Sequence, residues 1–131
     1  MRSERLNGDH QARERLRAFL RAPRLPIDVQ ALEWNDLAPG VRVHVLESTA
    51  GGDPKRALLW AQLNSEVPVH SHDVPEDTLV LEGTLELTGA GGGVYTPGTI
   101  FHSRPGTSHA ARNVGDGPCL CYVVYWPPAT D

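Results

Sequence analysis

The chain has 131 residues and a mass of 14.3 kDa, which is the size of one domain and too small for an enzyme with separate cofactor and substrate domains. Its formal net charge of -4 and its pI near 5.8 argue against nucleic acid as a partner. The 13 glycines and 11 prolines, beside 40% hydrophobic residues, disfavour both a helix bundle and a disordered chain and predict many short strands joined by turns.

Residues 1–24 form a basic arm. They hold seven arginines and three acidic residues. The formal net charge of the arm is therefore +4, and that of the remainder of the chain is -8. An amphipathic helix is predicted here, capped by Asp9 and ended by Pro23 and Pro26. We expect its apolar stripe to pack on residues 25–131 or on a second subunit, with a partner-binding or nucleic-acid arm as the alternative. The stripe consists of Ala12, Leu16, Phe19 and Leu20.

The helical period disappears after Leu25, and four apolar runs follow, each bounded by Gly, Pro, Asp or Asn. Such runs are typical of the short strands of a sandwich or barrel. The glycine-rich stretch 88–93 predicts an exposed hairpin loop rather than a phosphate site, because no helix pattern follows it. The predicted strands lie within 41–45, 58–63, 78–87 and 119–126.

Cys119 and Cys121 are the only cysteines, and they are too close in sequence to form a disulfide framework. They share a predicted strand face with Val123 and Tyr125, which favours two small buried side chains; soft metal ligation or a redox pair is the alternative. The longest nearly apolar run, 119–126, is far shorter than the ~20 residues that span a bilayer, and the N-terminus lacks an apolar signal region. We therefore expect a soluble cytoplasmic protein without a membrane partner.

Two histidines and a carboxylate form the strongest chemical pattern. His70 and His72 are two residues apart, so on a strand both imidazoles leave the same face, and Glu76 follows after a short turn. Two imidazoles and one carboxylate on one face can hold Fe(II) or a similar divalent ion while leaving positions open for a ligand. A barrel could bring His109 to the same place as a fourth ligand.

Other polar and aromatic residues have simpler interpretations. His44 and His102 lie on predicted strands outside the pattern, and we expect them to face solvent or to be hydrogen-bonded. Asp77 points away from the face of Glu76 and is predicted to be a surface carboxylate. The aromatic residues in apolar runs are predicted to belong to the core or to a dimer interface. They are Trp60, Tyr122, Tyr125 and Trp126.

Two segments resemble the paired motifs of the cupin superfamily, the RmlC-like jelly-roll proteins. They read His70-x-His72-x3-Glu76-x6-Gly83 and Gly98-x5-Arg104-x-Gly106-x2-His109-x3-Asn113. The resemblance covers roughly residues 33–126 and implies an all-β fold, an antiparallel double-stranded β-helix preceded here by a short N-terminal α-helix. It also implies that His70, His72, Glu76 and His109 are the metal ligands, and that the protein is a homodimer.

More narrowly, the chain is similar to the small cupins that include the cupin domain of bacterial zinc-binding anti-sigma factors and the dioxygenases that cleave acetylacetone and dihydroxyacetophenone. Anti-sigma factors of this kind also have a helical zinc domain with a His and Cys motif. Residues 1–24 contain one His and no Cys, so we expect a free-standing cupin. Two positions depart from the motifs: Asn64 stands where the first usually begins with Gly, and Arg104 where the second usually has Pro.

The resemblance implies a metal-dependent protein that acts on a small molecule. The first expectation is a mononuclear Fe(II) dioxygenase that cleaves a carbon-carbon bond of a diketone-like or hydroxy-ketone substrate, with Arg104 as a candidate substrate anchor. The alternative is a non-redox Zn or Ni cupin that acts as a binding or sensor module, or as an isomerase or cyclase. Mn is a further candidate metal, because ligand types alone do not identify the ion.

Overall fold

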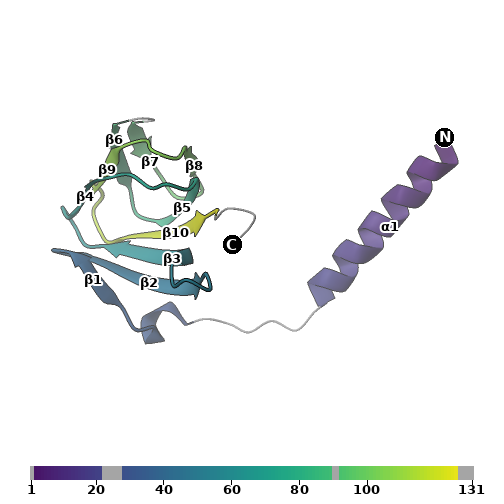
Figure 1. The fold of residues 1–131 in the computed structure, drawn as a ribbon, viewed down its shortest axis with the longest axis horizontal. Coiled ribbons are helices and arrows are strands. Elements are labelled where there is room, and N and C mark those ends of the chain that lie inside the picture. The colour runs from purple at the N-terminus through teal and green to yellow at the C-terminus, as the bar shows by residue number, and fades with distance from the viewer. Residues whose placement is uncertain (1, 22–27, 90–91, 127–131) are drawn as a thin grey trace. The chain divides into compact units, whose positions relative to one another are not determined.

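A computed structural model describes residues 2–21, 28–89 and 92–126 (Figure 1). The chain divides into two compact units, residues 1–31 and residues 32–131. The boundary predicted between residues 24 and 25 falls within 22–27, outside the described residues.

The first unit contains helix α1, Arg2–Arg21. The helix begins well before Asp9, so the prediction that Asp9 caps it is wrong; the preceding residues are mostly good helix formers and extend the helix toward the N-terminus. Leu16, in the predicted apolar stripe, is 57% exposed, and the packing of that stripe stays a prediction. The side chains of Phe19 and Leu20 and the positions of Pro23 and Pro26 lie outside what the structure describes.

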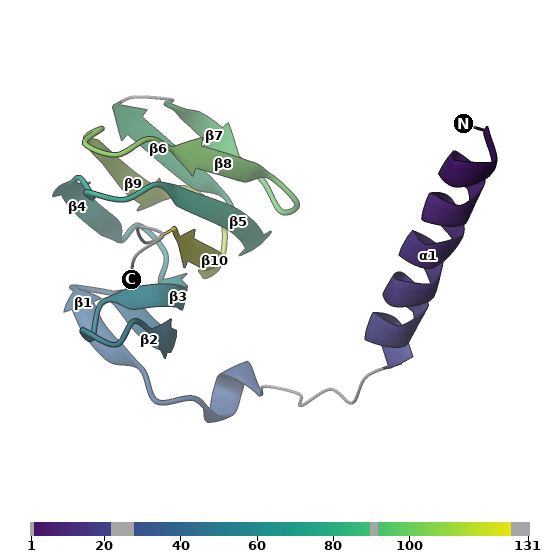
Figure 2. The same cartoon turned by 45° about the vertical axis from the view of Figure 1, so that its right-hand side comes forward.

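The second unit is the antiparallel β-barrel that the sequence predicts (Figures 1 and 2). A six-stranded sheet has the order β1-β2-β3-β10-β5-β8, and a four-stranded sheet has the order β4-β9-β6-β7. Every ladder between neighbouring strands is antiparallel among the described residues. Its strands are β1 Asn35–Ala38, β2 Val41–Ser48, β3 Pro54–Ala61, β4 Glu66–His70, β5 Glu76–Glu82, β6 Leu85–Gly89, β7 Gly93–Tyr95, β8 Ile100–Ser103, β9 His109–Asn113 and β10 Cys119–Tyr125, whereas the 3-10 helix Val29–Ala31 belongs to the first unit.

Strand β10 shows why these apolar runs become strands. Alternate side chains, Cys119, Cys121 and Val123, are 0%, 1% and 4% exposed and face the core, whereas the side chains between them are only partly buried. Both cysteines are free, and their sulfur atoms lie 3.9 Å apart. This confirms the prediction that they behave as small buried side chains.

Glycine interrupts the apolar run over 78–87. The structure has two strands here, β5 in the six-stranded sheet and β6 in the four-stranded sheet. Gly83 lies between them with φ +84°, and a Cβ on it would be 2.6 Å from the carbonyl oxygen of Pro118. Only glycine fits this bend between the sheets. Strands β6 and β7 pair as the predicted hairpin, although they extend further into the glycine-rich stretch than expected.

Asn113 fastens the loops at one end of the barrel. Its side chain is fully buried, and its Nδ2 donates to the carbonyl oxygens of Ala61 at 3.0 Å and Gly117 at 2.9 Å. Its Oδ1 accepts from the backbone N–H of Gly115. No helix among the described residues combines the length and apolar character needed to cross a membrane.

Candidate metal centre

The candidate ligands come from both sheets. His70 is the last residue of β4 and is the register partner of His109, the first residue of β9, in the four-stranded sheet. Glu76 is the first residue of β5, in the six-stranded sheet. His72 lies in the loop between β4 and β5, so the prediction that it shares a strand with His70 is wrong; the turn formers around Asp73 end the strand early.

Three of the predicted ligands form one group. The ligand atoms of His70, Glu76 and His109 all lie within 4.8 Å of one another. Glu76 and His109 are 6% and 5% exposed, and His70 is partly buried. This geometry can hold a metal ion.

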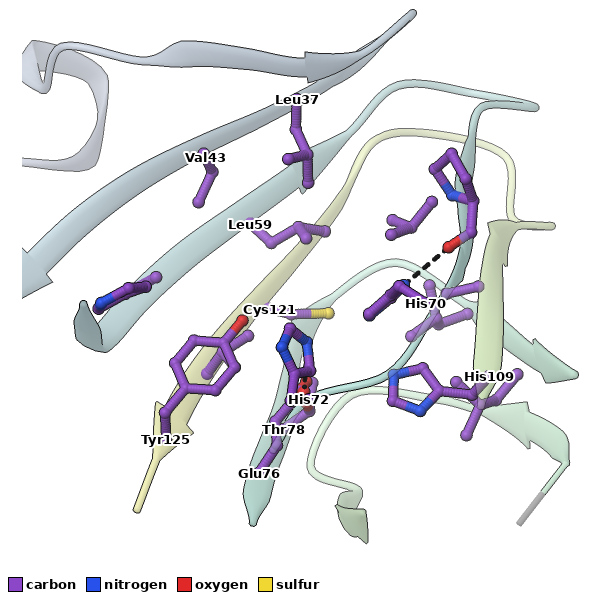
Figure 3. Close-up of a pocket in the computed structure, with 18 of the residues that line it drawn as sticks. Leu37, Val43, Leu59, His70, His72, Glu76, Thr78, His109, Cys121 and Tyr125 are labelled. Atoms are coloured by element: carbon purple, nitrogen blue, oxygen red, sulfur yellow. Dashed lines mark hydrogen bonds and ion pairs between the residues drawn. The ribbon is translucent and has the colours of Figure 1, made fainter. Parts of the chain in front are cut away.

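His72 lies beside this group. Its ring centroid is 4.9 Å from that of His70, and its Nε2 is 3.2 Å from Glu76 Oε2 (Figure 3). That contact lacks hydrogen-bond geometry, so both atoms remain without a hydrogen-bond partner. The fourth candidate ligand therefore lies beside the same carboxylate as His70 and His109.

The donor atoms fit a divalent ion. Three buried side-chain atoms have no hydrogen-bond partner among the described residues: His72 Nε2, Glu76 Oε2 and His109 Nδ1. Buried polar atoms in folded proteins are normally satisfied, so unsatisfied atoms on three of the four candidate ligands favour a partner bound at this place. Imidazole nitrogen and carboxylate oxygen are ligands of Fe, Zn, Ni and Mn alike.

Neighbouring groups orient the ligands. His70 Nδ1 lies 2.7 Å from the carbonyl oxygen of Pro68, to which it must donate, and this leaves Nε2 with the lone pair that a metal needs. Thr78 Oγ1 donates to Glu76 Oε1 at 3.1 Å, which leaves Oε2 for the ion. The N–H of Gly106 donates to the carbonyl oxygen of His72 at 2.8 Å and so ties the loop before β9 to the loop that carries His72.

Burial favours the metal-binding form of His109. Desolvation lowers the pKa of His109, and the neighbouring His70 and His72 add to that effect while Glu76 opposes it. The imidazole of His109 is therefore neutral at neutral pH, and a neutral imidazole is the form that binds a metal ion. Burial, together with the charge of Glu76, raises the pKa of Tyr125, so its phenol remains protonated.

The ligands lie at one end of an apolar cavity of about 470 Å³ within the barrel, here called the barrel cavity. Most of its wall is aliphatic, and Tyr125 and Thr78 line it beside the histidines. A cavity of this size and character is typical of a small-molecule site.

Sequence reasoning missed Thr78 and Tyr125. Thr78 is two residues after Glu76 and so shares its strand face, a signal that the sequence does contain. Tyr125 packs against the hydrophobic core, as predicted, and it also lines the barrel cavity, with its ring 5.0 Å from that of His72. It lies directly across from Glu76 in the β10–β5 ladder, a register that the sequence does not reveal.

Arg104, the candidate substrate anchor, is not brought to the site. Its side chain is exposed, and it is not among the residues that line the barrel cavity. Its carbonyl oxygen accepts from the N–H and the hydroxyl of Thr107, which closes the turn before β9. A role in substrate binding stays a prediction.

His44 and His102 lie outside the cavity and are hydrogen-bonded, as expected. His44 Nδ1 is 2.7 Å from the carbonyl oxygen of Glu33, and His102 Nδ1 is 2.6 Å from Asp77 Oδ1. Asp77 also accepts from Trp126 Nε1 at 2.7 Å. Trp126 is 53% exposed and does not belong to the core, because this bond holds its indole at the surface beside β5.

Comparison with known proteins identifies the family. The family model described as the ChrR cupin-like domain matches residues 23–129. No curated protein sequence matches the chain.

Solved structures with the same fold support this match. The crystal structure of Rhodobacter sphaeroides SigE in complex with the anti-sigma ChrR matches at 25% identity and TM-score 0.65, over 76% of this chain and 51% of that chain. The chain thus spans about half the length of that protein. An RmlC-like cupin from Shewanella frigidimarina matches at 20% identity and TM-score 0.63, over 82% and 96% of the two chains.

The polyketide cyclase RemF from Streptomyces resistomycificus matches at 19% identity and TM-score 0.64, over 79% of each chain. At that identity the likeness concerns the fold alone. The family match and the barrel geometry agree that this chain belongs to the ChrR cupin-like domain family and has the RmlC-like cupin fold.

Proposed function

We propose that this protein is a metal-dependent cupin in which His70, His72, Glu76 and His109 hold one divalent ion and a small molecule binds beside it in the barrel cavity. The observation that carries this proposal is the set of three buried atoms, from His72, Glu76 and His109, that have no hydrogen-bond partner. They face a cavity large enough for a small ligand.

In its enzymatic form we propose an Fe(II) dioxygenase that cleaves a carbon-carbon bond of a small diketone-like or hydroxy-ketone substrate. When bound, Fe(II) supplies oxygen activation and positions for the substrate's oxygen atoms. The aliphatic wall excludes water from the reacting end. Pro68 and Thr78 fix His70 and Glu76 in orientation, and the phenol of Tyr125 is placed to donate to a substrate oxygen.

A non-redox Zn or Ni cupin is the second candidate, favoured by the likeness to the anti-sigma ChrR, whose crystal structure contains SigE. In that case the barrel cavity acts as a ligand-binding sensor and the protein has a protein partner. Isomerase or cyclase chemistry at the same site is compatible with this form. The homodimer implied by the cupin resemblance stays a prediction.

Oxygen uptake separates the two candidates. The full chain is loaded anaerobically with Fe(II) and mixed with acetylacetone and other chelating ketones in an oxygen electrode. The dioxygenase proposal predicts uptake that His109→Ala abolishes and that His44→Ala, a matched histidine outside the cavity, preserves. Full metal occupancy without uptake for any substrate would leave the binding module as the function.

A further inference from the structure

The barrel cavity contains no cationic side chain. Of the described residues that line it, none is Lys or Arg, and Glu76 is its only acidic residue. Its other polar groups are imidazoles, one threonine hydroxyl, one phenol and one thiol. A ligand that carries a negative charge on the part remote from the metal centre would find no counter-charge there.

The polar groups are gathered at one end. Figure 3 shows His72, Glu76 and His109 together, with Leu37, Val43 and Leu59 lining the cavity away from them. These apolar residues come from β1, β2 and β3, which are the three neighbouring strands at one edge of the six-stranded sheet. The cavity therefore has a chelating end and an apolar end.

Three basic residues next to the apolar wall in sequence lie against groups outside the cavity. Lys55 and Arg56 follow the wall residue Pro54, but both lie against Glu47, at 3.9 Å and 2.9 Å. Arg42 precedes Val43 and faces the other side of the sheet, with its guanidinium 5.6 Å from the ring centroid of Trp60.

We infer that the barrel cavity selects a ligand whose oxygen atoms meet the end formed by the histidines and Glu76 and whose body is apolar and uncharged. Carboxylates and phosphates on that body are rejected, because burying an unpaired anion against an aliphatic wall is costly. The inference rests on the proposed function, since it takes the metal centre as the chelating end. To the proposed function, this inference adds the chemical class of the ligand.

A matched pair of probes tests it. 1-Phenylbutane-1,3-dione and its 4-carboxyphenyl analogue share the chelating end and differ only in a carboxylate group at the far end. Each is titrated calorimetrically into the full chain loaded with Zn(II), which has no redox chemistry. We expect the uncharged diketone to bind at least ~10-fold more tightly. Equal or tighter binding of the carboxylate, or binding of neither, would overturn the inference.

Substitutions test whether the apolar end of the barrel cavity determines the preference between the two probes. Val43→Lys places a cation at the apolar end and is expected to reverse the preference in favour of the carboxylate. Val94→Lys adds the same charge on β7, at a residue that is 58% exposed and outside the cavity, and should leave the preference unchanged. If Val43→Lys does not fold, Val45→Lys makes the same test at a cavity residue that is already 39% exposed.

Failure of the metal centre would be distinguishable from failure of this inference. Metal content is measured on the same samples by mass spectrometry. Should the chain hold no metal, the proposed function fails, yet the apolar wall still predicts that metal-free protein prefers the uncharged probe. A full complement of metal with no preference between the probes would overturn the inference and leave the metal centre intact.

Discussion

Glu76 is the residue on which the metal centre depends most. Its carboxylate is 6% exposed, accepts a hydrogen bond from Thr78 on one oxygen and faces His72 Nε2 with the other. A buried carboxylate without a cation is costly, and no Lys or Arg among the described residues lines its cavity. A bound divalent ion would stabilise Glu76 and also satisfy the unpartnered nitrogens beside it.

Replacing Thr78 with Val should weaken metal binding without unfolding the barrel. The change removes the hydroxyl that orients Glu76 Oε1 and keeps the side chain's shape, and loss of such an orienting bond lowers metal affinity by about 10-fold or more. Competition against a chelating dye measures the affinity. Thr88→Val is the control, since that hydroxyl is exposed and bonds only the carbonyl oxygen of Ala110. Equal affinities in the two variants would refute the role given to Thr78.

At the scale of single residues, the spacing of His70 and Glu76 predicted that they lie together, and the resemblance to the cupin motifs added His109 to them. Tyr125 could not be found in this way. Its place opposite Glu76 depends on the pairing of β10 with β5, and a shift of one residue would turn its ring out of the cavity.

Among the elements, the bend between β5 and β6 decides how the strand that carries Glu76 leaves the six-stranded sheet. Gly83 has φ +84° and lies close to the backbone of Pro118 and Cys119. Gly98 has a similar φ, +91°, but a Cβ on it would meet nothing within 4 Å beyond its own chain neighbours. A side chain at Gly98 would meet backbone strain alone, whereas one at Gly83 would meet both backbone strain and steric obstruction. Comparing the two positions therefore separates the two effects.

We expect Gly98→Ala to lower the free energy of unfolding by about 1 kcal/mol, the cost of a left-handed alanine. Gly83→Ala should lower it by about 3 kcal/mol or more, since its Cβ would also lie 2.6 Å from a backbone oxygen that cannot move freely. Urea denaturation of both variants gives the comparison. Similar losses would mean that the close approach to Pro118 is not significant.

Strand positions were predictable where apolar residues alternate, as in β10, and less so where a glycine or a turn interrupts the pattern. The run over 78–87 contains Gly83, where the chain leaves β5 and enters β6 in the other sheet. The spacing of His72 predicts a strand position, but the turn that begins near Asp73 releases it into a loop. Local turn chemistry thus prevails over periodicity in both cases.

For the whole molecule, the core and the cavity belong to the barrel. Every buried residue of the hydrophobic core, and every residue packed against it, lies between Ala38 and Tyr125. The charge is divided accordingly, with a basic arm at residues 1–24 and an acidic remainder.

Deleting residues 1–24 should leave the barrel folded. We expect the Tm to stay within about 2 °C of that of the full chain, because every core residue that the structure describes lies between Ala38 and Tyr125 and is kept. Differential scanning calorimetry measures it, and size-exclusion chromatography with light scattering reports the oligomeric state of both proteins. A drop in Tm of about 5 °C or more would show that the arm packs on the barrel, as the apolar stripe predicts.

The most direct test of the metal centre is the metal content of the untagged protein, measured by mass spectrometry in the parent and in two histidine variants. We predict about one divalent ion per chain in the parent and in His44→Ala, whose ring bonds the carbonyl oxygen of Glu33 and does not belong to the ligand group. His109→Ala should lose the ion. A parent that takes up no Fe(II), Zn(II) or Ni(II), or a His109→Ala variant that keeps its full complement, would contradict the assignment of the metal centre.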